Sequence, residues 1–411
     1  MIEEKEERMR KKVLGILTVI SMVVSMTACA GGGTAATTAQ TQGETEAASQ
    51  EAEPQKKETQ SSTKAAVQPS ATGGGSLTIP EDVEQLISKR AKGAPDEVLA
   101  FYDSWSAREM KEGKKPGEGF TVAVGTGDLY NDTALFGFWG TVKYLEEMGC
   151  NVIYNVGPGS YAPENAQVFE NFVAQNPDAI MWQFANSQLL GSGIEKAGQR
   201  NIPVFGLDNA LAGPTVVGEV TSDNFEIGRI AANYIVNKTS GEAKGVEVFA
   251  TGHRGIEIRH TMWDLITKEH PGIEEISEIP WTSPDVLTST RDRMDAVLEA
   301  NPEPGSIRFV HANYDLPGMA CADAIEAAGR QDEIFVIGID GDREAMQRIA
   351  AGSCFEATVS QDFMLMAFTI SHQIVDHLNG HEVPRFLYCP PTLVTKDNVA
   401  EVYKLKYGED L

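Results

Sequence analysis

The chain has 411 residues, of which 42% are hydrophobic and 23% charged, a balance typical of a globular protein rather than a disordered one. The 34 Lys and Arg residues stand against 59 Asp and Glu residues, which gives a formal net charge of −25. Nucleic acid would therefore be repelled except at a local basic patch, and no such patch follows the first twelve residues. The length leaves room for roughly two or three domains.

Residues 1–28 are predicted to be a secretion signal. A basic segment at 8–12 precedes an apolar run at 13–26, which is shorter than the roughly 20 residues that span a bilayer. Small residues stand directly before Cys29, and this arrangement resembles a bacterial lipoprotein signal. The resemblance implies cleavage before Cys29, lipidation of its sulfur, and an extracytoplasmic protein anchored to the cell membrane. An ordinary signal peptide with an incidental cysteine is the alternative.

Two segments separate the signal from the main fold. Residues 29–76 contain almost no large apolar side chains, so they cannot offset their ordering entropy and are predicted to be a disordered tether. Residues 77–118 are predicted to be a helical N-terminal extension. Pro80-Glu81-Asp82 and Pro95-Asp96-Glu97 are each typical of a first helical turn.

From residue 120 onward, short apolar runs alternate with amphipathic stretches. This alternation predicts an α/β protein of two lobes, whose parallel sheets are covered by helices on both faces. Strands are expected near 121–125, 151–155, 179–182, 203–207, 215–220, 245–250, 307–310, 334–339 and 357–361. Helices are expected at 133–148, 163–175, 187–199, 224–238, 255–269, 289–300, 317–328 and 342–351.

Polar residues follow the ends of these predicted strands. Ligands bind at the carboxyl ends of strands in open parallel sheets, so these positions are candidate binding residues. They include Tyr130 and Asn131, Asp208 and Asn209, His253, Arg254 and Arg259, Asn313 and Asp315, Asp340 and Gln361.

Several segments in this region also share their order and spacing with a known family. They are residues 121–149, 202–208, Ser222-Asp223-Asn224, 336–341 and 357–361, followed by 391–399. Together they resemble the type I periplasmic sugar-binding proteins, the ribose- and galactose-binding receptors of ABC transporters. The resemblance covers roughly residues 120–404.

The resemblance implies two Rossmann-like lobes joined by a three-segment hinge, with the ligand cleft between them. The crossings fall near residues 222–223, 361–362 and 390–391. Lobe one is then 119–222 plus 362–390, and lobe two is 223–361 plus 391–404. The ligand binds in the cleft, and the lobes close by hinge motion.

The resemblance also assigns ligand-binding residues. Carboxylates, amides and a guanidinium suit sugar hydroxyls because charge-assisted hydrogen bonds are strong. The assigned set is Asn131, Asp208, Asn209, Arg259, Asn313, Asp315, Asp340 and Gln361, with Tyr130, His253, Arg254 and Trp281 as additional candidates. Local alternatives stay open, since Asp208 and Asp340 could cap turns and Asn131 could cap a helix.

One departure concerns aromatic residues. Sugar-binding members usually stack aromatics at the start of the first helix, where this chain has Thr133 and Ala134. An aromatic face could instead come from Tyr130, Phe136, Trp139, Phe184 or Trp281, so the ligand's identity is left open.

These features predict a solute-binding lipoprotein of an ABC importer. It would bind a monosaccharide or a derivative and deliver it to a membrane permease. A sensor that presents its ligand to a membrane histidine kinase, or a receptor for a non-sugar ligand, remains an alternative. No enzyme, cofactor or metal is predicted, because nucleophile-elbow, complete dinucleotide-loop and metal-ligand motifs are missing from the sequence. Cys150, Cys321, Cys354 and Cys389 are expected to be buried thiols, with a Cys321–Cys354 bond left open.

Overall fold

The computed structural model describes residues 77–90, 114–160, 162–185, 187–209, 211–281 and 285–411. All of them belong to the compact unit Lys64–Leu411. The predicted signal, Cys29, the tether and the second half of the helical extension lie outside the described residues.

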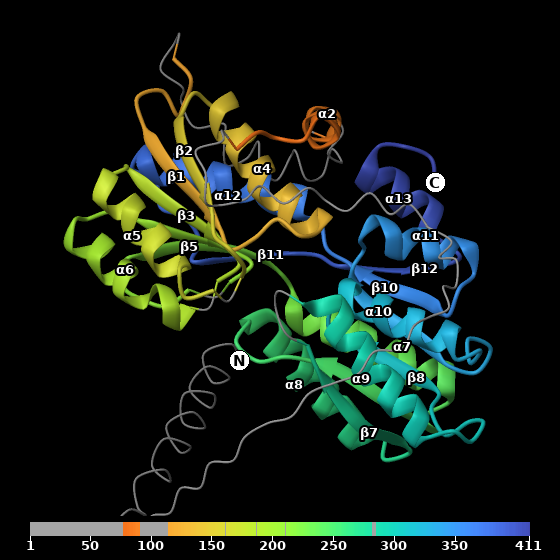
Figure 1. Cartoon of the computed structure of the whole chain (residues 1–411). Coiled ribbons are helices and arrows are strands. Elements are labelled where there is room, and N and C mark those ends of the chain that lie inside the picture. Colours follow the sequence, from red (N-terminus) through yellow and green to blue (C-terminus); the bar gives the residue numbers. More distant parts are fainter. Residues whose placement is uncertain (1–76, 91–113, 161, 186, 210, 282–284) are drawn as a thin grey trace, which may run out of the picture. The chain divides into compact units, whose positions relative to one another are not determined.

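The first sheet contains six parallel strands in the order β11-β5-β4-β3-β1-β2 (Figure 1). Its central strands are buried on both faces, which explains why they are continuous apolar runs in the sequence. Helices α4 and α12 pack together over one face, whereas α5 and α6 pack together elsewhere on the sheet. The elements are β1 (Thr121–Thr126), α4 (Asp132–Glu147), β2 (Asn151–Val156), α5 (Asn165–Gln175), β3 (Ala179–Gln183), α6 (Ser187–Gln199), β4 (Val204–Leu207), β5 (Val216–Ser222), α12 (Phe363–Leu378) and β11 (Phe386–Cys389).

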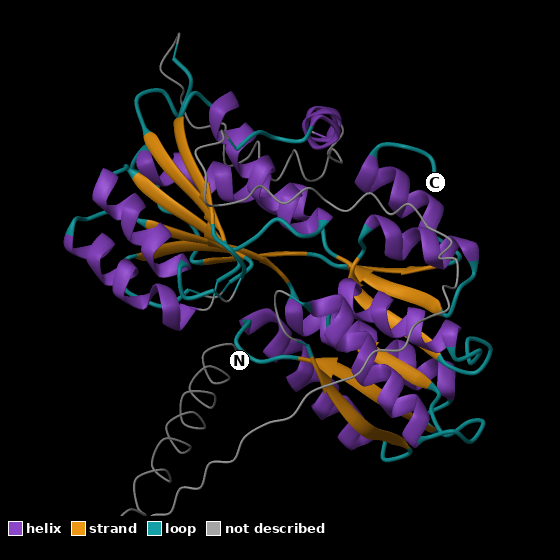
Figure 2. Ribbon diagram, in the orientation of Figure 1, coloured by secondary structure: helices purple, strands orange, loops and turns teal. Residues whose placement is uncertain are grey.

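The second sheet also contains six strands, in the order β12-β10-β9-β8-β6-β7, and only β12 runs antiparallel to its neighbour. Helix α7 packs with α8, and α9 packs with α10, so this sheet too is flanked by helices (Figure 2). The elements are α7 (Asn224–Thr239), β6 (Ala243–Phe249), α8 (Arg254–Glu269), β7 (Ile273–Pro280), α9 (Val286–Ala300), β8 (Phe309–Ala312), α10 (Asp315–Ala327), β9 (Phe335–Asp340), α11 (Arg343–Ala351), β10 (Phe355–Ser360), β12 (Thr392–Thr395) and α13 (Val399–Tyr407). We call the two sheets with their helices the first and the second lobe.

The chain passes between the lobes after β5, after β10 and after β11. Two of these crossings end directly in helix caps. The Asp223 side chain accepts a hydrogen bond from the Glu226 amide at 3.0 Å, and Asp362 accepts one from the Leu365 amide at 3.0 Å. A capped helix therefore begins as soon as the chain enters the other lobe, which limits the hinge to a few residues.

The α/β class and the alternation of strands and helices are confirmed, but five elements were not predicted. β7, β11 and β12 lie at sheet edges, where short or acidic segments lack a buried apolar run. Helix α12 was not predicted either; most of its side chains are buried, because α4 and the first sheet pack against it. Helix α13 was also not predicted from the sequence.

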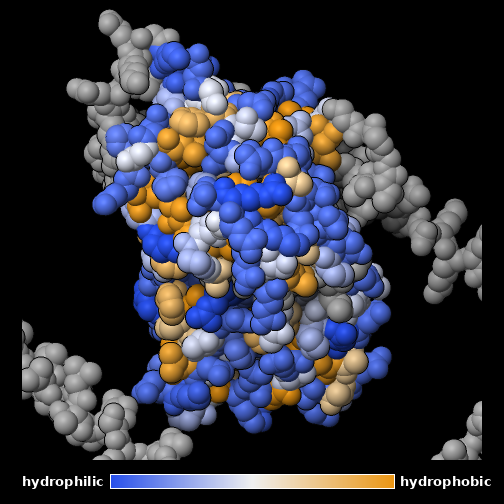
Figure 3. Space-filling model, turned by 90° about the vertical axis from the view of Figure 1, so that its left-hand side faces the viewer, coloured by the Kyte–Doolittle hydropathy of each residue, from blue (hydrophilic) through white to orange (hydrophobic). Residues whose placement is uncertain are grey.

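The surface drawn in Figure 3 is mostly hydrophilic, with smaller hydrophobic areas between the polar ones. Within the described ranges, no helix is both long and apolar enough to cross a membrane. The four cysteines in these ranges are buried free thiols, so Cys321 and Cys354 do not pair.

Helix α2 (Glu81–Arg90) is the described part of the N-terminal extension, and it packs against α4. Val83, Leu86 and Ile87 are buried in this contact. Lys143 on α4 forms an ion pair with Glu84 at 2.9 Å. The extension therefore adds its apolar face to the core of the first lobe.

Replacing Ile87 by Ala should lower the free energy of unfolding by about 2–5 kcal/mol, because the side chain is 1% exposed and its removal leaves a cavity. Urea denaturation of the purified protein would measure the change. Gln85→Ala, on the exposed side of the same helix, is the control and should change stability by less than about 0.5 kcal/mol. Equal effects of the two substitutions would contradict the packing of α2.

Candidate functional site

The carboxyl ends of strands from both lobes face a shared cavity with a volume of about 100 Å³. A buried water needs roughly 10–15 Å³, so this space accommodates several waters or part of a small ligand. The first lobe contributes Asp128, Tyr130, Asn131, Thr133, Ser160, Phe184 and Asp208. The second lobe contributes His253, Ile256, Arg259, Trp281, Val286, Tyr314, Leu316, Asp340 and Gln361.

The loop after β1 places three polar residues at the cavity. Asp128 accepts hydrogen bonds from the amide and hydroxyl of Ser160, which follows β2. Burial raises the pKa of Asp128. The Tyr130 hydroxyl donates to the Pro158 carbonyl at 3.1 Å. Asn131 lines the cavity and also caps α4, since its Oδ1 accepts from the Ala134 amide at 2.9 Å.

Asp208 lies at the end of β4 in the left-handed backbone region, with φ 54°, which Asp tolerates better than most residues. Its Oδ1 accepts from the Thr221 hydroxyl of β5 at 2.8 Å. Its Oδ2 lies 3.8 Å from Nε2 of His253 in the opposite lobe. Asp208 is 3% exposed, so its carboxylate is held facing the cavity by partners from both lobes.

Asn209, also assigned as a ligand contact, instead uses its side chain to join backbone segments of the first lobe. Its Oδ1 accepts from the Ala185 amide at 2.5 Å, and its Nδ2 donates to the Trp182 carbonyl at 2.6 Å. These bonds tie the end of β4 to the end of β3. Asn209 does not line the main cavity; with Arg254, whose side chain is 58% exposed, it lines a neighbouring one.

Arg259 is the buried guanidinium of the site, with 2% exposure. Its Nε donates to Oδ1 of Asn224 at 2.7 Å, and its Nη1 donates to the Asn313 carbonyl at 2.8 Å. These bonds hold the guanidinium at the cavity wall, where its positive charge opposes the rise in the pKa of Asp340 that burial causes.

Asp340 ends β9 with φ 122°, a conformation that side chains other than Gly rarely adopt. Its carbonyl accepts from the Gln361 amide at 3.0 Å and from Lys406 Nζ at 2.7 Å. Its Oδ1 accepts from Gln361 Nε2 at 2.6 Å. Strained backbone held by several partners is common at ligand sites. Lys406 was not predicted, because it lies on the unpredicted helix α13.

Oε1 of Gln361 and Nδ1 of His253 are buried at the cavity and have no hydrogen-bond partner among the described residues. Leaving such an atom unpaired costs about 1–3 kcal/mol. A ligand hydroxyl that bonds to either atom would recover this energy. Burial lowers the pKa of His253, which favours the neutral imidazole.

Asn313 and Asp315, both predicted ligand contacts, do not line the cavity. Asn313 Nδ2 donates to Glu247 Oε1 at 2.8 Å. Asp315 accepts from the Thr358 hydroxyl and from the Asp342 amide, each at 2.8 Å. Both side chains are fully buried, and their neighbours Tyr314 and Leu316 line the cavity instead.

Asp315, Asp340 and Asp342 form a buried acidic cluster beside the cavity. Burial and the neighbouring Asp340 raise the pKa of Asp315 to about 8. Burial, followed by the other two carboxyls, raises the pKa of Asp342. Lys406 opposes this repulsion.

The lobes touch each other across the cavity. The Thr133 hydroxyl donates to Asp342 Oδ1 at 3.2 Å, and the Arg343 amide donates to Asp132 Oδ2 at 3.2 Å. The rings of Phe184 and His253 are 6.0 Å apart. These contacts join the two lobes beside the cavity, two of them where α4 and α11 begin and the third between the residues that follow β3 and β6.

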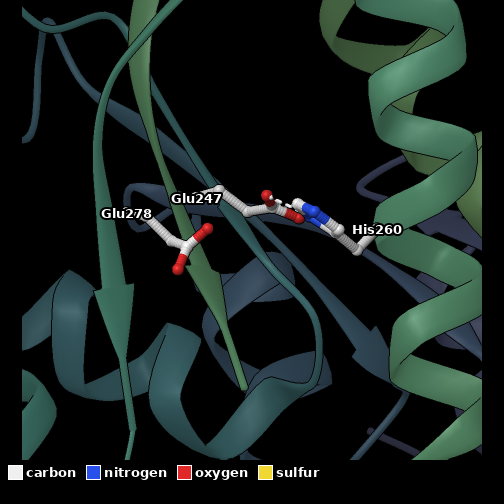
Figure 4. Close-up of side chains that lie close together, drawn as sticks. All are labelled: Glu247, His260 and Glu278. Atoms are coloured by element: carbon white, nitrogen blue, oxygen red, sulfur yellow. Dashed lines mark hydrogen bonds and ion pairs between the residues drawn. The ribbon is translucent and has the colours of Figure 1, made fainter. Parts of the chain in front are cut away.

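One group among the described residues could hold a metal ion, and it lies outside the cavity. Glu247 on β6, His260 on α8 and Glu278 on β7 bring donor atoms within 4.8 Å of one another (Figure 4). Both oxygens of buried Glu247 already accept hydrogen bonds, one from Asn313 and one from His260 at 2.8 Å. Glu247 and His260 form an ion pair, and Glu247 also holds Asn313, whose backbone carbonyl accepts from Arg259.

Of the additional candidates, Tyr130, His253 and Trp281 line the cavity. Seven further residues line the cavity although no ligand contact was predicted for them: Asp128, Thr133, Ser160, Ile256, Val286, Tyr314 and Leu316. For Asp128 and Tyr314 the position after a predicted strand was a usable signal. Val286 follows β7, which was not predicted, so no signal was available there.

A family model described as periplasmic binding protein domain matches residues 131–382, more than half of the chain. The chain belongs to this family. It is 24% identical over 252 residues to a fructose import binding protein of Bifidobacterium longum, covering 59% of this chain and 74% of that protein. It is 25% identical over 286 residues to a ribose import binding protein of Bacillus subtilis, covering 67% of this chain and 88% of that protein.

Solved structures of ABC transporter components are similar as well. A sugar transporter subunit of Rhodobacter sphaeroides has 26% identity and a TM-score of 0.65, with 68% of this chain and 99% of that chain covered. A solute-binding protein of Agrobacterium vitis with bound allitol has 25% identity and a TM-score of 0.66, with 70% and 99% covered. The type I periplasmic binding protein fold and the membership predicted from the sequence are therefore confirmed.

The buried acidic cluster predicts a pH dependence. A carboxyl with a raised pKa in the folded state stabilises the fold at low pH, and this stabilisation is lost as the pH rises from about 4 to about 8. In Asp315→Asn the side chain cannot ionise. The stability of the variant relative to wild type should therefore rise by on the order of 2–4 kcal/mol between pH 5 and pH 8.

Urea denaturation at several pH values would measure this difference. Below about pH 3, Asp315 is protonated in both the folded and the unfolded state, so the stability difference measured there serves as the reference. A stability difference that does not change with pH would show that Asp315 is ionised in the folded protein.

Proposed function

We propose that the protein is an extracytoplasmic solute-binding component of an ABC importer, which binds a small polyhydroxylated ligand, a monosaccharide or a derivative of one. The observation that carries this proposal is the cavity between the lobes, lined by Asp208, Arg259, Asp340 and Gln361. The relatives named as fructose and ribose import binding proteins, and the structure with bound allitol, support the same ligand class.

The chemistry of the lining suits hydroxyl groups. Carboxylates of Asp208 and Asp340 accept from hydroxyls, Arg259 donates to them, and Gln361 Oε1 offers a free acceptor. Phe184, Trp281 and Tyr314 supply apolar faces that can pack against the carbon skeleton of a sugar. The assigned contacts that line the cavity are therefore Asn131, Asp208, Arg259, Asp340 and Gln361.

Closure would couple binding to transport. We propose lobe boundaries of 119–222 plus 362–390 and 223–361 plus 391–404, with hinge motion at the three crossings. A ligand that contacts both lobes favours the closed state by its differential affinity for that state. The closed state then offers the membrane permease a surface made by both lobes.

The membrane attachment is a proposal from the sequence. The signal-like residues 1–28 and Cys29 support lipidation of Cys29, and residues 29–76 would then act as a tether. The lipid would then hold the protein on the outer side of the membrane. We further propose a binding role without catalysis, in keeping with the family of binding proteins to which the chain belongs.

A thermal-shift screen of the purified protein tests the ligand class. The panel would contain monosaccharides, cyclitols, sugar phosphates, nucleosides and amino acids. A ligand at 100 times its dissociation constant adds roughly 2.7 kcal/mol of stability, which raises Tm by a few degrees. A Tm shift with sugars would support the proposal. A Tm shift with nucleosides or amino acids alone would show that the ligand belongs to that class and not to the sugars.

Asp340→Asn should weaken binding of the identified sugar about ten- to a hundredfold. The substitution keeps the acceptor for Gln361 but removes the charge, and hydrogen bonds to charged groups contribute about 1.5–3 kcal/mol. Isothermal titration calorimetry would measure the affinity. Asp264→Asn, an exposed residue on α8, is the matched control. Unchanged affinity in Asp340→Asn would place the ligand elsewhere.

Cys29→Ala should release the protein into the medium or the soluble extracytoplasmic fraction, because the residue that carries the lipid is lost. Fractionation of cells followed by immunoblotting would show the distribution. Retention of the variant in the membrane fraction would contradict lipid anchoring.

A further inference from the structure

Part of the cavity is lined by hydrophobic side chains from the second lobe. They are Ile256, Trp281, Val286, Tyr314 and Leu316. Ile256, Trp281 and Val286 belong to one core cluster, and Tyr314 and Leu316 pack against it. The rings of Trp281 and Tyr314 meet edge to face, with centroids 5.1 Å apart. We call these five residues the apolar wall.

The apolar wall lies on one side of the sheet. Its residues follow β6, β7 and β8, which are neighbours, whereas Asp340 and Gln361 follow β9 and β10. The described lining after β7 and β8 is therefore hydrophobic, whereas the lining after β6 combines Ile256 with the polar side chains of His253 and Arg259.

The polar side chains in the segment after β8 do not interrupt the wall. Asn313 is bound to Glu247 at 2.8 Å, and Asp315 is bound to Thr358 at 2.8 Å, so both are held inside the lobe. Among the described residues after β7 and β8, those that line the cavity are Trp281, Val286, Tyr314 and Leu316.

At the apolar wall, this arrangement favours apolar groups of a ligand over polar ones. A hydroxyl pressed against Val286 and Leu316 would give up its hydrogen bonds to water and find no donor or acceptor on those side chains. A methyl or thioether group would instead gain from leaving water. Ligand hydroxyls are favoured toward the polar lining residues, among them Asp208, Arg259, Asp340 and Gln361, rather than toward Val286 and Leu316.

We infer that the ligand is amphipathic, a sugar derivative whose hydroxyls meet the polar side chains while a methyl, alkyl or thioalkyl substituent packs against the apolar wall. This inference rests on the proposed function and narrows its ligand class. It also accounts for the departure at Asn313 and Asp315, which would otherwise have met hydroxyls in this region.

Matched pairs of sugars test the inference by calorimetry on the purified protein. Each pair differs in one group, a terminal hydroxymethyl in the parent and a methyl in the analogue. The pairs are D-galactose with D-fucose, D-glucose with 6-deoxy-D-glucose, and D-ribose with 5-deoxy-D-ribose. In the pair that binds best, the deoxy analogue should bind at least about fourfold more tightly than its parent, the factor that corresponds to one buried methylene.

A substitution in the apolar wall tests whether the methyl group of the deoxy analogue packs there. Leu316→Asn keeps the size of the side chain but adds hydrogen-bonding groups, so it should reduce or reverse the preference for the deoxy analogue. Leu287→Asn makes the same change at a residue that is 50% exposed and should leave the preference as it is. The thermal unfolding of both variants would confirm that they are folded.

The outcomes separate the two proposals. Equal or tighter binding of the hydroxylated parent, or a preference that Leu316→Asn does not alter, overturns the amphipathic ligand and leaves the sugar-binding function in place. If no sugar of either kind binds, the proposed function fails and this inference fails with it.

Discussion

The parallel direction of the strands is the constraint on which the site depends. A parallel sheet that is buried on both faces has room for polar side chains mainly where its strands end. In each lobe, the carboxyl ends of the strands lie along one edge, and the two edges face the same cavity. Short loops after the strands then bring Asp208, Arg259 and Asp340, which are far apart in the chain, to one small volume.

Charged side chains can be buried in that small volume only if hydrogen bonds and opposite charges offset the loss of their hydration. Arg259 is held by Asn224 and by the Asn313 carbonyl, and the strained backbone of Asp340 is held by Lys406 and Gln361. Buried charges are tolerated when they are paired and hydrogen-bonded. The partners come from α7, α13 and the hinge, so much of the second lobe is organised around keeping a few charged groups at the cavity wall. The unpaired atoms on Gln361 and His253 remain available to a ligand.

The same hydrogen bonding explains why some of the residues predicted to contact the ligand do not line the cavity. Asn313 and Asp315 are the residue types expected to meet hydroxyls, and they follow a strand as expected. Glu247, Thr358 and the Asp342 amide bind them inside the lobe, and none of these partners is near them in the sequence. Tyr314 and Leu316 consequently face the cavity. Asn209 likewise serves to fasten two strand ends, a role that depends on the contact between β3 and β4.

The sequence by itself determined the α/β class, most strands and helices, and the positions after strand ends where ligand contacts could lie. These properties follow from local periodicity and from the direction of parallel strands, which need no knowledge of distant neighbours. The tertiary structure alone decided which of those residues face the cavity, that β7, β11 and β12 complete the sheet edges, and that α13 supplies Lys406. Each of these depends on contacts between segments far apart in the chain, because burial and hydrogen bonding orient a side chain only after the lobes have formed.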